Sequence, residues 1–253
     1  MITLSSDFGS PYPAAMKGAI LRRTDARLVD VAHDFPRQDV RAAAFWLREV
    51  LPQFPPAVHL AVVDPGVGTG RAVLAIAAGD HVLVGPDNGL LLPAARRIAT
   101  DEPAVYAVDH GDPDSSTFHG RDVFAPLAAD VHDGRPEIFD GDGRFSLAED
   151  YESIAFPDPV WVDDEIRGEV LVVDGFGNAI TNVPGHVLDG LFGSSVGVND
   201  ATVPVRRTYG AVDPGDRLVT VGSHGNVELA VNRGRGDDSF GVDVESQVVF
   251  DVG

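Results

Sequence analysis

Hydrophobic and polar residues follow two different patterns along this chain of 253 residues. In the first half, short apolar runs typical of buried strands alternate with segments whose apolar residues recur every three or four positions, as on one face of a helix. The expected strands are 2–4, 26–32, 58–63 and 105–108, with a hairpin of 72–77 and 81–84. The expected helices are 13–23, 39–51 and 88–98, of which the second starts near Gln38 or Asp39. This order predicts an α/β domain with a partly parallel, layered sheet.

The second half of the chain has a different pattern of apolar and polar residues. From about Pro136 to Pro159 the chain is acidic, rich in glycine and proline and without periodicity, and we interpret this stretch as a linker. Beyond it, short runs of Val, Leu and Ile are separated by Gly, Asp and Asn, which is typical of a small antiparallel sheet or β-barrel. The expected strands are 169–173, 179–183, 195–198, 217–221, 227–231 and 247–252. We therefore expect two domains, residues 1–150 and 160–253.

Composition narrows the class of protein. The hydrophobic fraction of 44% is ordinary for a globular protein. No apolar run approaches the roughly 20 residues that a membrane-spanning helix needs. Because the chain enters a strand at Ile2 without a basic, apolar leader, we expect a cytoplasmic protein. The absence of cysteine excludes disulfides and thiolate metal sites.

The charge is strongly negative. Asp and Glu total 39 against 19 Lys and Arg, which gives a formal net charge of −20, and Lys17 is the only lysine. Such a balance repels nucleic acids and anionic membranes, so neither is expected as a partner. The acids are dispersed rather than grouped in a tail. We interpret this composition as that of an acidic, halophilic-type protein kept soluble in concentrated salt, where charge repulsion is screened.

Two acids follow predicted strands in the first half. In open α/β sheets, ligands bind beyond the carboxyl ends of the strands. Asp7 follows the first strand, where a carboxylate can bind the two hydroxyls of a ribose, although it can equally cap a helix or close a turn. Asp64 precedes a turn with three glycines that leads to Arg71. One interpretation of this turn is a cradle for a phosphate, although it lacks a phosphate-binding glycine motif. A tight turn closed by an Asp64–Arg71 ion pair is an equally good interpretation.

Other polar positions are ambiguous when taken singly. His119 precedes a predicted helix at 122–129, where the helix N-terminus favours a neutral imidazole or a bound anion. The eight histidines show no metal-binding spacing, so no metal site is expected. Asp87 or Asn88 is expected to cap the helix 88–98. The segment from Asp174 to Asn178 is a glycine-rich hairpin whose aromatic residue can also stack on a base.

Taken together and in order, these motifs resemble those of the S-adenosyl-L-methionine hydroxide adenosyltransferase family, a relative of the enzymes that make 5′-halogenated adenosines. The resemblance runs from Ser5 to about Asn232. It is carried by Ser6-Asp7-Phe8-Gly9, Met16-Lys17-Gly18, Val62-Val63-Asp64-Pro65-Gly66-Val67-Gly68 with Arg71, Pro86-Asp87-Asn88-Gly89, Ser116-Thr117-Phe118-His119-Gly120-Arg121-Asp122, Asp174 with Phe176-Gly177-Asn178, and Ser223 with Gly225.

The resemblance implies an α/β domain joined to a small β-barrel domain, in a homotrimer whose ligand lies between the first domain of one subunit and the second domain of the next. It implies that Asp64, Arg71 and His119 handle water. The implied substrate contacts are Asp7 with ribose, Asp174 with the methionine ammonium, Phe176 and Asn178 with adenine, and Ser223 with the methionine carboxylate. His224 is a departure, because the family often has a smaller or different residue there.

The implied reaction is hydrolysis of S-adenosyl-L-methionine to adenosine and L-methionine, without a cofactor, by attack of water or hydroxide on the ribose C5′. Halide-using relatives lack residues matching Arg71 and His119, and this chain has both. Two other functions stay open at this point. One is a 5′-halo-adenosine synthase that uses chloride, and the other is a non-catalytic protein that binds S-adenosylmethionine or a nucleoside.

Overall fold

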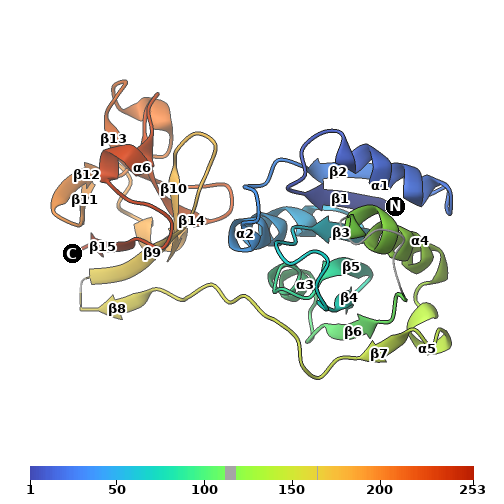
Figure 1. Ribbon diagram of the computed structural model, residues 1–253. Coiled ribbons are helices and arrows are strands. Elements are labelled where there is room, and N and C mark those ends of the chain that lie inside the picture. The colour runs from blue at the N-terminus through green and yellow to red at the C-terminus, as the bar shows by residue number, and fades with distance from the viewer. Residues whose placement is uncertain (112–117, 164) are drawn as a thin grey trace. The chain divides into compact units, whose positions relative to one another are not determined.

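A computed structural model describes residues 1–111, 118–163 and 165–253 of the chain (Figure 1). The chain divides into two compact units, Met1–Ala155 and Phe156–Gly253. Each has its own hydrophobic core, and each is described here by itself. Among the described residues, no helix combines the length and apolar character needed to cross a bilayer.

The first unit is built on a seven-stranded sheet in the order β2-β1-β3-β5-β4-β6-β7. The strands β2, β1, β3 and β5 are parallel, and the remaining pairs are antiparallel. Of the parallel strands, β1, β3 and nearly all of β5 are buried, whereas the edge strand β2 is only partly buried, because helices cover both faces of the central strands. The strands are β1 Ile2–Ser6, β2 Leu28–Ala32, β3 Val58–Val62, β4 Val73–Ala78, β5 His81–Pro86, β6 Ala104–Val108 and β7 Phe145–Leu147.

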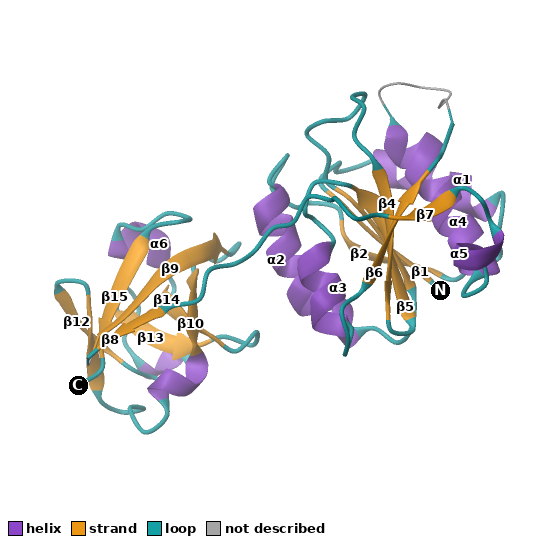
Figure 2. Cartoon of the chain, turned by 90° about the horizontal axis from the view of Figure 1, so that it is seen from below, coloured by secondary structure: helices purple, strands orange, loops and turns teal. Residues whose placement is uncertain are grey.

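Helices flank this sheet on its two sides (Figure 2). On one side, α1 (Tyr12–Leu21) and α4 (Ala125–Gly134) share a core with the strands. On the other, α2 (Val40–Val50) packs against α3 (Leu92–Ile98). As expected, α2 is amphipathic, and Asp39 caps its start with a carboxylate that accepts a hydrogen bond from Ala42 N at 2.9 Å. A short η1 (Leu51–Gln53) follows α2, and α5 (Ile138–Gly141) follows α4.

The strand order fixes where a ligand can bind. From β1 the chain crosses to β2 on one side and then returns to β3 on the other, so β1 and β3 are neighbours whose connections leave in opposite directions. A crevice opens beyond the carboxyl ends of two such strands. Asp7 follows β1 and Asp64 follows β3 within two residues, so both acids lie at this switch point.

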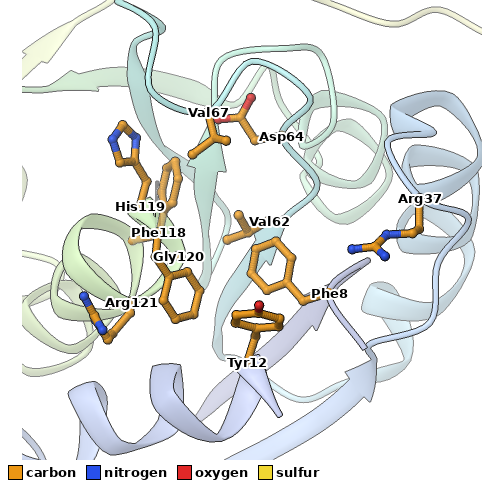
Figure 3. Close-up of a pocket in the computed structure, with 11 residues that line it drawn as sticks. Phe8, Tyr12, Arg37, Val62, Asp64, Val67, Phe118, His119, Gly120 and Arg121 are labelled. Carbon is orange, nitrogen blue, oxygen red and sulfur yellow. The ribbon is translucent and has the colours of Figure 1, made fainter. Parts of the chain in front are cut away.

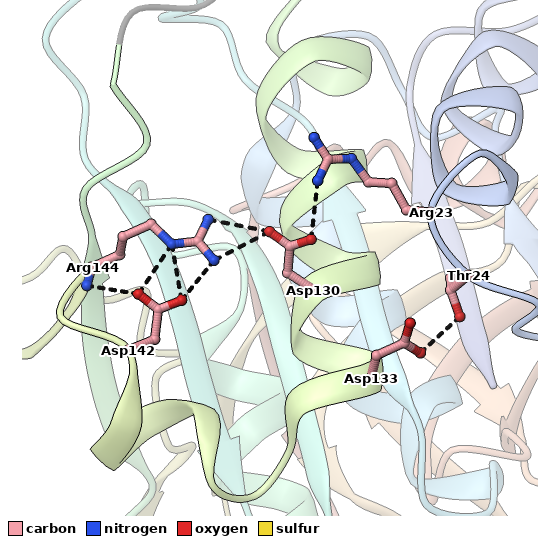
Figure 4. A network of polar contacts seen from close by, with 6 residues as sticks. All are labelled: Arg23, Thr24, Asp130, Asp133, Asp142 and Arg144. Atoms are coloured by element: carbon pink, nitrogen blue, oxygen red, sulfur yellow. Dashed lines mark hydrogen bonds and ion pairs between the residues drawn. The ribbon is translucent and has the colours of Figure 1, made fainter.

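Ion pairs hold α4 against its neighbours (Figure 4). Asp130 accepts from Arg23, which follows α1, at 3.1 Å and from Arg144, which precedes β7, at 3.1 Å. Arg144 also pairs with Asp142 at 2.7 Å, and Thr24 Oγ1 donates to Asp133 at 2.7 Å. These contacts are partly exposed, so each contributes little, but together they connect three segments around the helix that follows His119.

The second unit is a curved sheet in the order β12-β11-β15-β9-β10-β14-β13, with β8 paired to β9. It nearly closes on itself, because a bridge between Val205 and Val219 brings the end of β12 back to β13. The strands are β8 Val160–Val162, β9 Glu165–Val173, β10 Ala179–Pro184, β11 Ser195–Val198, β12 Ala201–Pro204, β13 Arg217–Val221, β14 Asn226–Val231 and β15 Gln247–Asp251. The short helices are η3 Gly185–Leu188, η4 Tyr209–Ala211 and α6 Gly236–Phe240.

The predicted fold class, an α/β first part and a barrel-like second part, is confirmed. Several details of the sequence interpretation are wrong. The linker is too long, because α5 and β7 lie within 136–159 and β7 pairs with β6. Strands β8 and β12 were missed, since β8 is exposed along its length and β12 buries only one residue. The third error concerns the start of α3.

Helix α3 begins at Leu92 and not at Asn88. The reason is tertiary, because Asn88 Nδ2 donates to Val63 O at 2.8 Å and Asn88 Oδ1 accepts from Leu90 N at 3.2 Å. Gly89 adopts a φ of +84° and pairs with Ser153, which keeps residues 88–91 out of the helix. Asn88 therefore ties the end of β3 to the turn after β5 instead of capping α3.

Candidate functional site

A pocket of about 520 Å³ lies at the switch point between β1 and β3 (Figure 3). Its walls come from the loop after β1, the end of β3, the start of α1 and the segment that leads into α4. The lining residues are Phe8, Tyr12, Arg37, Val62, Asp64, Val67, Phe118, His119, Gly120, Arg121 and Phe124. Two of the three residues implied to handle water, Asp64 and His119, are thus on its wall.

Asp64 and Arg71 form the ion pair that the sequence left as one of two interpretations. Arg71 Nε lies 3.0 Å from Asp64 Oδ1, and the Asp64 side chain is only 6% exposed. The same Asp64 oxygen accepts a hydrogen bond from Gly66 N at 2.9 Å, which tightens the turn. Gly66 has no side chain for a physical reason, since a Cβ there would overlap the Arg71 guanidinium.

Arg71 is held from a second direction as well. Its Nη1 donates to the backbone oxygen of Asp87 at 2.8 Å, which links the glycine-rich turn to the end of β5. The Nε atom is buried and has no hydrogen-bond partner among the described residues, so its interaction with Asp64 is electrostatic rather than a well-aligned hydrogen bond. A guanidinium fixed in this way keeps its remaining N–H groups in a constant orientation.

A second pocket, of about 410 Å³, contains Arg71 and His119 together. Gly68, Gly70, Val108 and His110 are among its other lining residues. Because His119 lines both pockets, the structure brings the carboxylate and the guanidinium of the glycine-rich turn and the imidazole of a distant stretch to one region of the first unit.

His119 immediately precedes a π-helical turn, η2 (Gly120–Phe124), which continues into α4. The sequence predicted an ordinary helix here, and π-helical turns are rare and frequent at functional sites. Next to it, Arg121 donates to both oxygens of Asp122, at 2.5 and 2.7 Å. These bonds lower the pKa of the Asp122 carboxyl. Ser116 and Thr117 of the same motif lie outside the described residues.

Asp7 is 9% exposed, and its Oδ2 accepts a hydrogen bond from Gln38 N at 2.7 Å. Gln38 has a φ of +62°, so this bond stabilises an unfavourable backbone conformation before α2. Asp7 therefore closes a loop through Oδ2, and the bond to Gln38 does not involve its other carboxylate oxygen. The neighbouring Ser6 Oγ contacts His33 Nδ1 at 2.8 Å, which secures the same end of β1.

Asp87, whose backbone oxygen binds Arg71, makes a further contact through its side chain. Its Oδ1 accepts from Glu152 N at 2.8 Å. Burial raises the pKa of the Asp87 carboxyl, although Arg71 opposes this effect. Asp87 thus binds the backbone of the segment near Glu152 and does not cap α3.

In the second unit, Asp174 organises the hairpin between β9 and β10. Its Oδ1 accepts from the backbone nitrogens of Phe176 and Asn178, at 2.9 and 2.8 Å, and its Oδ2 accepts from Asn178 Nδ2 at 2.9 Å. Asn178 is 6% exposed, whereas the Phe176 ring is 81% exposed. The hairpin interpretation is therefore correct for Asp174, and the same bonds present Phe176 to solvent.

Ser223 is exposed in the turn between β13 and β14, and the adjacent His224 is buried. His224 Nε2 lies 3.0 Å from Glu228 Oε1, and Tyr209 OH donates to Glu228 Oε2 at 2.7 Å. Burial and the Glu228 carboxylate raise the pKa of Tyr209. The residue that departs from the family pattern is thus part of a partly buried polar network of His224, Glu228 and Tyr209 beside the Ser223 turn.

Several residues of the first pocket were not found from the sequence. Tyr12 and Arg37 carry no local motif, since one starts a helix and the other lies in a loop. Val62, Val67 and Phe124 look like ordinary core or turn residues in the sequence. Only the way the elements pack brings them to the same wall.

Comparison with protein families finds two matching family models. Residues 2–138 match the SAM hydroxide adenosyltransferase N-terminal domain, and residues 168–249 match the C-terminal domain of the same family. The two matches lie in the two structural units.

Curated relatives and solved structures cover nearly the whole chain. A protein of Salinispora tropica named (R)-S-adenosyl-L-methionine hydrolase is 43% identical over 95% of this chain and 94% of its own length. A protein of the same name from Thermus thermophilus is 43% identical over 94% of each. An uncharacterized conserved protein from Thermotoga maritima has a similar structure, with a TM-score of 0.86 and 31% identity over 99% of both chains.

Proposed function

This chain belongs to the SAM hydroxide adenosyltransferase family, and on that basis we propose that it is an enzyme that hydrolyses S-adenosyl-L-methionine to adenosine and L-methionine. Its relatives are named for the substrate with the (R) configuration, and we extend the same preference to this chain. The sulfonium sulfur is a stereocentre, so a pocket that fixes the ribose can distinguish the two epimers.

One observation carries the proposal. Asp64 and Arg71 are an ion pair at the end of β3, and His119 lines pockets with each of them beside the β1–β3 switch point. A carboxylate, a guanidinium and an imidazole in one region are the groups that activate and orient a nucleophile, and binding a nucleoside without reaction does not require all three.

The reaction needs a water oxygen placed in line with the bond between C5′ and sulfur. As the C5′–O bond forms and the C5′–S bond breaks, the electron pair of that bond moves to sulfur, and methionine leaves as a neutral thioether. Asp64 or His119 accepts the proton of the water, and the other orients its oxygen. Arg71 stabilises the developing hydroxide. Hydroxide and sulfonium neutralise each other in this step, so a site shielded from bulk water favours it.

The remaining contacts follow the family motifs. Asp7 binds the ribose through the oxygen that Gln38 leaves unused. In the second unit, Asp174 binds the methionine ammonium, Phe176 and Asn178 the adenine, and Ser223 the methionine carboxylate. The exposure of Phe176 fits a ring that gains its partner only in a complex. We further propose that the chain forms a homotrimer in which units of different copies complete each site, and that it works in the cytoplasm without a metal or cofactor.

Product analysis in H₂¹⁸O tests this function. The purified chain is incubated with each sulfonium epimer of S-adenosylmethionine, with and without concentrated chloride. We expect adenosine carrying ¹⁸O at its 5′ position, together with unlabelled methionine, mainly from the (R) epimer. Recovery of 5′-chloroadenosine instead would identify a halide-using enzyme. Intact substrate after prolonged incubation would identify a binding protein.

A further inference from the structure

Three aromatic rings meet on the wall of the 520 Å³ pocket (Figure 3). Tyr12 and Phe118 are 5.4 Å apart between ring centroids, Phe8 and Phe118 are 5.9 Å apart, and Phe8 and Tyr12 are 6.4 Å apart. Each pair is edge-to-face, with interplanar angles of 73° to 80°. We call these residues, Phe8, Tyr12 and Phe118, the aromatic cluster.

The cluster is assembled from three separate segments. Phe8 lies in the loop after β1, Tyr12 is the first residue of α1, and Phe118 precedes His119. Gly120 makes their convergence possible, since a Cβ at that position would lie 3.0 Å from the Phe8 ring and 3.1 Å from the Phe118 ring. A larger residue there would push the rings apart.

Burial of apolar surface does not account for the whole cluster. Phe8 and Phe118 pack against the core of the first unit, but Tyr12 is 52% exposed. An aromatic ring that lines a pocket while staying half open to solvent is placed to contact something in the pocket.

The charges around the pocket have both signs, so the rings themselves must supply the attraction for a cation. The Asp64 carboxylate also lines the pocket, but it is paired with Arg71, and Arg37 is another lining residue. Arg121, the nearest cationic neighbour in sequence, is paired to both oxygens of Asp122 and lies 5.3 Å from the Phe118 ring. The faces of aromatic rings carry negative electrostatic potential and attract cations, most strongly where water is excluded.

We infer that the aromatic cluster is a recognition site for the substrate's sulfonium group, a role that rests on the proposed function. The sulfonium charge is spread over the methyl and methylene groups bonded to sulfur, so their polarised C–H bonds can contact the ring faces. The cluster distinguishes the cationic substrate from its neutral thioether analogue, S-adenosylhomocysteine. After C5′–S cleavage the leaving thioether is neutral, and the rings lose their hold on it.

This role makes a kinetic prediction that a catalytic role does not. The sulfonium charge is largest in the bound substrate and declines as the C5′–S bond breaks. The cluster therefore stabilises the substrate at least as much as the transition state. Loss of a ring should raise KM and leave kcat unchanged or higher, whereas loss of a group that acts on the transition state lowers kcat.

Binding of two unreactive analogues to the full chain tests the inference. Sinefungin carries a protonated amine in place of the sulfonium, and S-adenosylhomocysteine is neutral at that position. The variants are Tyr12→Leu, which removes a half-exposed ring, and its matched control Tyr12→Phe, which keeps the ring. Phe118→Leu serves as a second variant, and calorimetry measures each dissociation constant.

We expect Tyr12→Leu to weaken sinefungin about 5- to 30-fold, the range of a desolvated cation–π contact. S-adenosylhomocysteine should change less than about twofold, and Tyr12→Phe should bind both ligands like the parent. Equal weakening of the two analogues would overturn the inference, because the rings would then be an apolar wall. So would failure of the parent to prefer sinefungin. None of these measurements requires turnover, so they separate this inference from the hydrolase assignment, which adenosine formation tests.

Discussion

Arg71 Nε lies 3.0 Å from Asp64 Oδ1 across a turn in which a Cβ at Gly66 would overlap the Arg71 guanidinium. The two charges come from opposite ends of one glycine-rich segment, and Arg71 is also bound to the backbone of Asp87. The ion pair that closes the turn is therefore compatible with the proposed roles of both residues in the reaction. The contact that closes the turn also fixes the guanidinium beside the pocket.

Replacement of Arg71 by Ala should lower turnover far more than substrate binding. If the guanidinium stabilises the developing hydroxide, kcat should fall about 10²- to 10³-fold, as when one preorganised donor to a developing anion is removed. KM should stay within a few-fold. Steady-state kinetics with the (R) epimer measures both. Equal losses in kcat and in substrate affinity would show that Arg71 acts mainly in binding.

Gly66→Ala tests the same geometry without removing a charge. The new methyl group would overlap the Arg71 guanidinium and displace it from Asp64. We expect kcat to fall by at least about tenfold, because a shift of an ångström can cost that much. Gly70→Ala is the matched control, since a Cβ at Gly70 meets open space in the same turn. Similar kinetics for the two variants would mean that flexibility of the turn, and not the position of Arg71, is what matters.

The sequence carried enough information to predict that Asp64 and Arg71 pair, but not which residues line the pocket. Asp64 and Arg71 were identifiable because an acid at a strand end and an arginine after three glycines form a local pattern. Tyr12 and Arg37 have no such pattern, and their place on the pocket depends on how α1 and the loop before α2 pack. At Asn88 the sequence did show a strong local pattern, that of a helix cap, but the prediction was wrong because the side chain binds Val63 O instead.

In the fold, periodicity predicted strands well where one or both faces are buried. The sequence did not predict strand β8, because Val160, Trp161 and Val162 are all exposed and burial imposes no alternation of apolar and polar residues there. The predicted strand began at 169 and missed the first residues of β9, because Glu165 and Arg167 flank a single buried residue there, Ile166. These segments are strands because a neighbouring strand supplies hydrogen bonds, which a local hydrophobic pattern does not reveal.

Asp130→Asn should destabilise the chain modestly, and salt should reduce the effect. Asp130 accepts from Arg23 and Arg144 at the surface of α4, and such pairs contribute about 1 kcal/mol or less. Removal of one acid also relieves repulsion in a chain of net charge −20. The control Asp158→Asn removes the same charge at an exposed position, so the difference in unfolding free energy between the variants isolates the arginine contacts. That difference should shrink between low and molar salt. A difference that stays constant would show that packing, not charge, is affected.

Stability should fall as the pH drops below about 6.5, because of one buried histidine, His59, in the first unit. His59 is 1% exposed, and its ring nitrogens contact Thr3 Oγ1 and His81 Nδ1, both at 2.8 Å. Burial, reinforced by His81 and Arg135, lowers the pKa of His59 to about 3. The unfolded chain takes up a proton near pH 6.5 while the folded chain does not, so acid favours unfolding.

The expected slope is about 1.4 kcal/mol of unfolding free energy per pH unit for this one group, over the range from just below 6.5 toward 3. Above about pH 7.5 the effect vanishes, since both states are then neutral at this position. Urea unfolding of the parent and of His59→Gln between pH 5 and 8 measures it, and the variant should show the shallower slope. His186→Gln, at an exposed histidine, is the matched control and should keep the slope of the parent. If His59→Gln keeps the full slope, the acid sensitivity comes from other groups and His59 is protonated in the folded chain.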